Sequence, residues 1–320
     1  MLTKIFSIAR WTIVFLIIFV AGAVMLNASK GDSGVMDELA NIPAAYSYAR
    51  YLDYRLNPEH PPLVKLLAGI PLLFQDLHFP IESPNWQRDI NGQRAVGAQF
   101  LYESGNDADQ IIFWARIGPI LLTLLLILLI YIWAKELIGR WWALLPAFLF
   151  GFSPTVLAHG HYVTMDIGAA FGFVVSIWSF LNFLSKPSRK TLFLAGVLFG
   201  VAQLLKFSNF LLVPYLGLIL LIFWIISSVR EGRFSSQVLF RYIVSLAGIF
   251  AIGFALVFAV YLVLTWNYPI AKQQADTELI LGSFGPQVLA NFVIWFSGIP
   301  VIRALAEYFL GLFMASQRAV

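Results

Sequence analysis

Two adjacent carboxylates, Asp37 and Glu38, form the densest chemical group in the sequence. They follow soon after the first apolar run. Adjacent carboxylates raise each other's pKa, and partial burial raises it further. Such a carboxylate suits general-base work on a hydroxyl or the binding of a divalent cation. The alternative is that acidic residues simply gather at the outer end of a membrane helix.

A second group lies in the segment 53–65, which is rich in proline. Three prolines there fix φ and stiffen the backbone, namely Pro58, Pro61 and Pro62. A stiff segment can hold Glu59, His60 and Lys65 in set positions. The alternative is a rigid turn whose charges are merely solvated.

Metal chemistry is permitted by the sequence without being indicated by it. The chain has four histidines, which are His60, His78, His159 and His161. They permit a metal site but do not argue for one, so no metal ligands are predicted. The cofactor stays unknown, and a divalent cation is the one that the acidic pair would accept.

Three charged residues interrupt or border apolar runs, where a charge is costly and usually functional. They are Arg116, Asp166 and Lys206. Alternating spans place all three at the same membrane face as Asp37 and Glu38. Two cations at that depth suit an anionic group such as a lipid phosphate. The alternative is interfacial anchoring by long side chains that reach toward water.

Composition decides the kind of element that must position these groups. The chain has 320 residues, of which 60% are hydrophobic and 12% are charged. Soluble domains carry about 25% charged residues. The chain is therefore predicted to be an integral membrane protein. Since it lacks cysteine, disulfides, thiolate metal sites and cysteine nucleophiles are excluded.

Long continuous apolar runs predict an all-α polytopic bundle of about eight spans, because backbone amides in hydrocarbon must pair internally. The first run, Trp11–Leu26, is interpreted as an uncleaved helix and not as a signal peptide. The expected organisation is a first membrane helix at 1–27, an external loop at 28–110 and a helical bundle at 111–320. The later spans are expected at Ile111–Trp133, Trp142–Ala158, Ile167–Leu184, Thr191–Leu205, Phe210–Ser227, Tyr242–Leu264 and Val288–Ile302.

The loop at 28–110 is too long to be a plain connection, and its apolar stretch Leu63–Phe74 is too short to span. Interfacial helices are expected there. The loop holds six basic and eleven acidic residues. The short connections of the other face hold the basic residues Lys4, Arg10, Lys135, Arg140, Lys186, Arg189, Lys190, Arg230, Arg233 and Arg241. Positive charge marks the cytoplasmic face, which predicts a cytoplasmic N-terminus in the plasma (inner) membrane and an external site.

The acidic pair and the run Leu56–Lys65 resemble the first external loop of bacterial relatives of the protein O-mannosyltransferases. These are membrane glycosyltransferases of the GT-C type. The segments Ala115–Gly118, Ser153–Asp166 and Leu204–Ser208 are similar to later parts of the same family. Members usually continue beyond this length, so we expect a fragment, a truncated product or a minimal form.

The resemblance implies a polyprenyl-phosphate sugar as donor and inverting transfer to a hydroxyl of a protein, lipid or glycan. It implies that Asp37 is the general base and that Glu38 supports it. Arg116 and Lys206 would bind the phosphate, with Asp166 beside them. Glu59, His60 and Lys65 would shape the substrate site.

Two other functions stay open on sequence grounds. One is a transporter or flippase of a lipid-linked saccharide, although mid-span positions are nearly all apolar. The other is a structural membrane subunit without activity. Nucleic acid is not an expected partner, because the basic residues do not gather on one face of a domain. The sugar, the acceptor and the oligomeric state are not determined.

Overall fold

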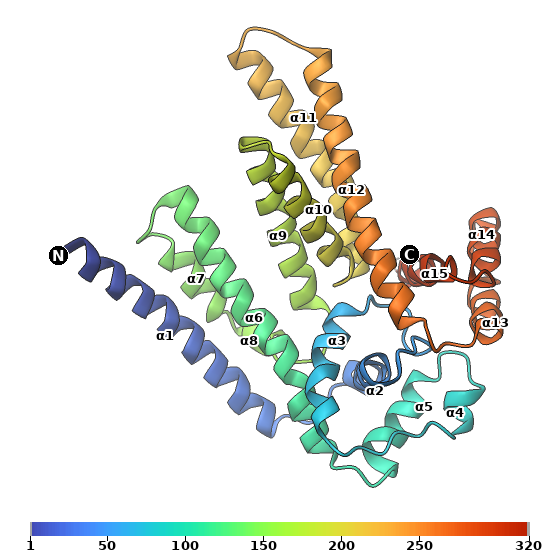
Figure 1. Ribbon diagram of the computed structural model, residues 1–320. Helices are drawn as coiled ribbons and strands as arrows, with labels where there is room; N and C mark the ends of the chain where they lie inside the picture. The colour runs from blue at the N-terminus through green and yellow to red at the C-terminus, as the bar shows by residue number, and fades with distance from the viewer. Residues whose placement is uncertain (1, 319–320) are drawn as a thin grey trace.

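The chain folds as a bundle of long helices with a helical cap at one end (Figure 1). The structure is a computed structural model that describes residues 2–318, with side chains described for 8–317, so the side chain of Lys4 lies outside the description. Among the described residues, five helices are long and apolar enough to cross a membrane. They are α1 (Leu2–Gly31), α6 (Ala108–Ile138), α9 (Asp166–Ser185), α11 (Leu212–Arg230) and α12 (Ser236–Leu264).

The other three expected spans form shorter helices. The stretch 142–158 is divided into α7 (Leu144–Gly151) and α8 (Pro154–His159). The division falls where Pro154 begins a new helix, since proline lacks the N–H needed inside one. The stretches 191–205 and 288–302 hold α10 (Arg189–Gln203) and α14 (Gln287–Ser297), which are shorter than a typical span of about 20 residues.

The segment between α1 and α6 is a folded cap and not an extended loop. It holds α2 (Met36–Tyr51), α3 (Leu63–Gly69), a 3-10 turn at Ile70–Phe74, α4 (Pro84–Gln87), α5 (Gln93–Ala98) and a π turn at Gln99–Glu103. Aromatic side chains fill its core, among them Tyr46, Phe79, Trp86 and Phe100. Large rings bury much apolar area at low entropy cost, which lets so small a unit pack. The side chains of Ile70, Leu73 and Phe74 remain exposed, as an interfacial segment requires.

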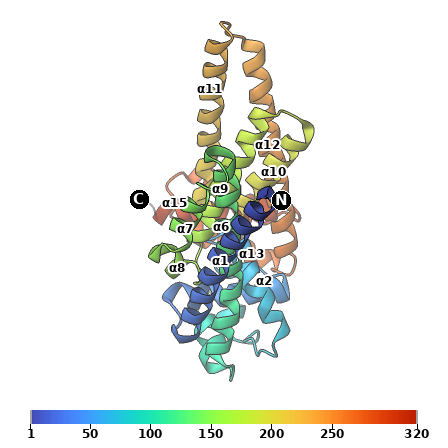
Figure 2. The same ribbon diagram turned by 90° about the vertical axis from the view of Figure 1, so that its left-hand side faces the viewer.

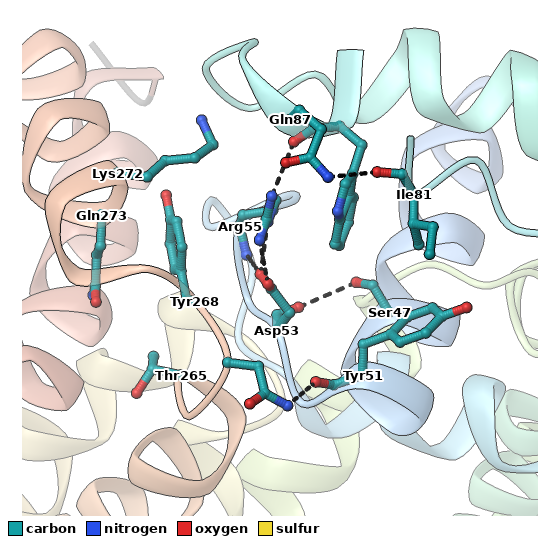
Figure 3. A network of polar contacts seen from close by, with 12 residues as sticks. Ser47, Tyr51, Asp53, Arg55, Ile81, Gln87, Thr265, Tyr268, Lys272 and Gln273 are labelled. Atoms are coloured by element: carbon teal, nitrogen blue, oxygen red, sulfur yellow. Dashed lines mark hydrogen bonds and ion pairs between the residues drawn. The ribbon is translucent and has the colours of Figure 1, made fainter. Parts of the chain in front are cut away.

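The C-terminal helices α13 (Ile270–Leu281), α14 and α15 (Arg303–Arg318) pack beside this cap. Buried Arg303 ties them to the end of α12 by donating to the backbone carbonyls of Thr265, Trp266 and Tyr268. On the cap side, Arg55 pairs with Asp53 and stacks on Trp86, facing the same α12–α13 connection (Figure 3).

The two ends of the bundle differ in charge. The turns 139–143, 186–188 and 231–235 lie at the end away from the cap, and α11 and α12 extend furthest from it in both views (Figures 1 and 2). Among the charged residues at or near these turns, the acids are Glu136 and Glu231, whereas the basic residues are Lys135, Arg140, Lys186, Arg189, Lys190, Arg230, Arg233 and Arg241. The structure therefore gathers the short basic connections at one end and the acidic cap at the other.

Candidate active site

Asp37 and Glu38 open helix α2 but point in different directions. Successive helical residues are rotated by about 100° around the axis. Glu38 is fully buried, whereas Asp37 is exposed and lines a small polar cleft. The Glu38 carboxylate reaches back to accept from the backbone N–H of Val35, and it also accepts from that of Val163 at 3.0 Å. Glu38 thus fixes the first turn of the helix that carries Asp37.

Arg116 of α6 forms a bidentate, buried ion pair with Glu38, with N–O distances of 2.9 and 2.7 Å. Its other N–H groups donate to the backbone carbonyls of Ser29, Asp32 and Ser33. A guanidinium has five N–H donors. All five are engaged by the protein in this structure, so Arg116 holds the junction between α1 and α2 and has no donor left for a phosphate.

Lys65 is also buried and committed to the protein. Its ammonium donates to the carbonyls of Asn57 and His60 at 2.7 and 2.8 Å and to the Tyr48 hydroxyl at 3.0 Å. Burial lowers its pKa well below the usual lysine value. Lys65 therefore shapes the backbone of the segment that carries Glu59, and it does not face the cleft.

Glu59 and His60 lie where the stiff segment turns past the N-terminal half of α2. The Glu59 carboxylate is buried and accepts from the Gln93 amide at 2.6 Å. Burial, with help from the positive charges of Lys65 and Lys206, lowers the pKa of His60 to about 4. His60 is therefore a neutral imidazole at neutral pH.

Lys206 and Asp166 form a partly exposed ion pair at 2.7 Å, with His159 at 3.5 Å from the second Asp166 oxygen. Asp166 begins α9, and Lys206 immediately precedes the 3-10 turn Phe207–Leu211. Two spans thus bring the cation and its partner to the cap end of the bundle. Lys206 keeps more than a quarter of its side chain exposed, so it can meet a ligand.

Two hollows meet at Glu59 and His60. The first is the polar cleft of about 60 Å³, which Asp37, Asn57 and Gln93 also line. The second is a largely apolar groove of about 490 Å³, whose polar end carries Lys206. Its walls are Phe207, Phe210, Leu211, Leu312 and Ala315. Asp37 therefore lines one hollow and Lys206 lines the other, and Glu59 and His60 are common to both.

Sequence reasoning missed several residues that complete these hollows. Asn57 lies inside the proline-rich segment, and an asparagine before a proline gives no role by itself. Gln93 and the apolar wall from α15 carried no sequence signal, because their partners are distant in the chain. Asp32 lines neither hollow, and its carboxylate accepts from His161 and Tyr162 at 3.0 Å each, while Arg116 lies over the Tyr162 ring.

Within residues 2–318, no group of three or more His, Asp or Glu side chains is placed so that it could hold a metal ion. The other residues with oxygen acceptors in their side chains that line the cleft with Asp37 are Asn41, Asn57, Glu59 and Gln93.

Comparison with known proteins supplies one family. Residues 108–266, nearly half of the chain, match the dolichyl-phosphate-mannose-protein mannosyltransferase family. Neither a curated protein nor a solved structure matches the chain. The match covers α6 to α12 and so includes Arg116, Asp166 and Lys206, whereas the acidic pair lies outside it. The chain is a multi-pass helical membrane protein that over these residues is similar to the dolichyl-phosphate-mannose-protein mannosyltransferases, which supports a GT-C type relative.

Proposed function

We propose that the protein transfers a sugar from a polyprenyl-phosphate donor to an acceptor hydroxyl, with inversion at the anomeric carbon. The observation that carries this proposal is the pair of hollows joined at Glu59 and His60. An apolar groove that ends at an ammonium fits a prenyl chain ending in a phosphate. A cleft that holds an exposed carboxylate next to it fits the acceptor hydroxyl and its base.

The reaction is a single displacement. Asp37 takes the proton of the acceptor hydroxyl as its oxygen bonds to the anomeric carbon. The bond from that carbon to the phosphate oxygen breaks, and the phosphate leaves with the electron pair. Lys206 stabilises the charge that grows on the leaving phosphate, because its ammonium is held at the groove by Asp166.

The remaining residues position these groups. Glu38 and Arg116 form one rigid unit that fixes the N-terminus of α2, and thereby Asp37. The phosphate role expected for Arg116 passes to Lys206, since each Arg116 donor is already bonded. Lys65 holds the backbone of residues 57–60, so that Glu59 and His60 form the wall between the hollows.

We place the cap and the site on the external face of the inner membrane and the basic turns in the cytoplasm. The support is the separation of charge between the two ends of the bundle, which agrees with the preference of short cytoplasmic loops for Lys and Arg. The acceptor would then be a protein, lipid or glycan hydroxyl outside the cell, and membrane lipids would surround the five spans.

The test of this function is transfer of labelled sugar from polyprenyl-phosphate donors in membranes that contain the protein. Asp37→Asn keeps size and shape but removes the base, so we expect transfer to fall by about 10²–10⁴-fold. Asp76→Asn, at an exposed cap position, is the matched control and should leave transfer unchanged. Full activity of Asp37→Asn would refute its role as base.

A second variant separates donor binding from chemistry. Lys206→Ala should weaken binding of a polyprenyl phosphate, whereas Lys186→Ala at the opposite end should not. Equal effects would mean that Lys206 only anchors the helix end. If well-folded protein binds polyprenyl phosphates and moves them across vesicle membranes without transferring sugar, the protein is a transporter. If the well-folded protein binds no polyprenyl phosphate, the result favours a structural membrane subunit without activity.

A further inference from the structure

Two side-chain amides beside Asp37 have their orientation fixed by the surrounding chain. Asn57 donates its Nδ2 to Asn41 Oδ1 at 2.7 Å, and Asn41 in turn donates its Nδ2 to the Val163 carbonyl at 2.7 Å. A carbonyl can only accept, which sets the direction of both bonds. Gln93 likewise turns its Nε2 toward the Glu59 carboxylate at 2.6 Å.

These constraints leave two acceptor oxygens buried and without a donor. Asn57 Oδ1 and Gln93 Oε1 are each inaccessible to solvent and receive no hydrogen bond from any residue between 2 and 318. Asn57 as a whole is 3% exposed. A buried acceptor left unpaired is unfavourable, because its bond to water is lost and not replaced. Both oxygens belong to residues that line the same small cleft, so a rotation of either amide toward the cleft would let a ligand supply the missing donor.

The cleft that these residues line selects for hydroxyl groups. It also holds Asp37, Glu59, the His60 imidazole and the Arg94 guanidinium, so acceptors and a donor face the same space. A hydroxyl donates and accepts at once and suits such a mixed lining. A divalent cation would instead be opposed by Arg94. The volume of about 60 Å³ corresponds to roughly two water molecules and so admits substituents of a ring, not a whole sugar.

We propose that this cleft recognises hydroxyl groups of the transferred sugar, and that Gln93 and Asn57 determine which sugar the enzyme accepts. The inference rests on the proposed glycosyl transfer. A sugar held between Lys206 and Asp37 must pass the wall formed by Glu59 and His60, which the cleft and the groove share. Ring hydroxyls that enter the cleft hydrogen-bond to the two amide oxygens once these side chains turn toward them, and a donor without those hydroxyls leaves the oxygens buried and unpaired.

The experiment measures Kd for three ligands in the absence of acceptor: a polyprenyl-phosphate sugar, its monodeoxy analogues, and the polyprenyl phosphate without sugar. In the wild type, removal of one of the recognised hydroxyls should weaken binding about tenfold, since one lost buried hydrogen bond costs about 1.4 kcal/mol. Gln93→Met preserves length but removes the amide. This variant should bind the sugar-bearing donor about tenfold more weakly and lose its discrimination against one deoxy analogue, with binding of the sugar-free phosphate unchanged.

The matched control is Gln87→Met on α4, where the amide donates to the Ile81 carbonyl away from the cleft. It should change none of the three constants. A second variant, Asn57→Gly, removes the other acceptor without backbone strain, because Asn57 has φ +53°, which glycine also adopts readily. It should lose discrimination at a different hydroxyl of the sugar.

The outcomes separate this inference from the function on which it rests. If Gln93→Met and Asn57→Gly both bind the polyprenyl phosphate and retain full discrimination among the deoxy analogues, the sugar is not read in this cleft. The same conclusion follows if the variants alter only the KM for the acceptor, or only the response to a divalent cation. If the wild type binds neither polyprenyl phosphate, the proposed glycosyl transfer fails, and this inference fails with it.

Discussion

At the scale of single residues, the acidic pair shows how one helical step separates two roles. Glu38 is buried against Arg116, while Asp37 remains exposed in the cleft. Arg116 and Lys206 divide in the same way. One is bound on all sides by the protein, and the other remains partly exposed at the polar end of a groove. The residue type alone could not distinguish the cation that is fully paired within the protein from the one that stays partly exposed.

The Glu38–Arg116 pair should dominate the local stability of the cap. Glu38→Gln leaves the Arg116 charge buried without its counter-ion, which typically costs about 3–5 kcal/mol. We expect a clear fall in the unfolding midpoint of the detergent-solubilised protein, accompanied by loss of transfer. Glu103→Gln, at an exposed cap position, should leave the midpoint within error. A midpoint for Glu38→Gln equal to that of the control would contradict a stabilising role of the Glu38–Arg116 ion pair.

His60 should make stability depend on pH. Its pKa is about 4 in the folded protein and near 6.5 when exposed, so the unfolded chain binds more protons between these values. The stabilising contribution of the neutral ring is fully present above pH 6.5 and is lost as the pH falls toward 4. His60→Asn should therefore reduce the pH dependence of the unfolding midpoint between pH 6.5 and 4. His78→Asn, at an exposed position, serves as control, and parallel curves for wild type and His60→Asn would exclude the effect.

At the scale of elements, the site is an assembly of parts from both ends of the chain. The cap supplies Asp37 and Glu59, the α9 and α10 region supplies Asp166 and Lys206, and α15 closes the groove. Helix α15 approaches the proline-rich segment closely enough that Gly311 lies against the Pro58 carbonyl and the Phe207 ring. The backbone just before Glu59 is therefore braced by a helix that follows it by some 250 residues.

That close approach yields a prediction. A methyl group at position 311 would overlap the Pro58 carbonyl, so Gly311→Ala should push α15 away from the segment 58–60. We expect a lower unfolding midpoint and weaker donor binding, because overpacking typically costs about 1–3 kcal/mol. Gly217→Ala on α11 has open space around it and should be neutral or slightly stabilising. Unchanged donor binding in Gly311→Ala would mean that α15 does not support the donor site.

At the scale of the whole molecule, charge and shape divide the protein into two ends. The acidic cap lies at one end, and the basic turns lie at the other (Figure 1). Residues of the cap line both hollows. A membrane placed across the five long helices would hold these ends on opposite sides. The proposed transfer would then take place at one face, with the lipid donor entering sideways along the apolar groove and no path needed through the bilayer.

The orientation can be measured because the chain has no cysteine. Single replacements Glu82→Cys in the cap and Ser185→Cys at the end of α9 both fall at exposed positions. With an impermeant maleimide on intact cells, we expect Glu82→Cys to be labelled and Ser185→Cys to be labelled only after lysis. The reverse pattern would invert the proposed topology and place the site in the cytoplasm.

The sequence by itself determined the class of fold, because apolar runs of spanning length leave the backbone no alternative to helices in lipid. Five of the eight expected spans are helices of sufficient length. The other three are shorter, since Pro154 divides one of them and the apolar runs of the other two are brief. The family followed from short motifs whose order along the chain is distinctive, and the match over residues 108–266 supports it.

Only the tertiary structure decided which of the predicted site residues line the two hollows. Burial and pairing depend on neighbours that are far away in the chain, such as Glu38 with Arg116 or Asn57 with Asn41 and Gln93 with Glu59. No local pattern encodes such contacts, because each partner is an ordinary polar residue in its own segment. The packing of the cap against the bundle and α15 therefore separated the structural charges from those that line the hollows.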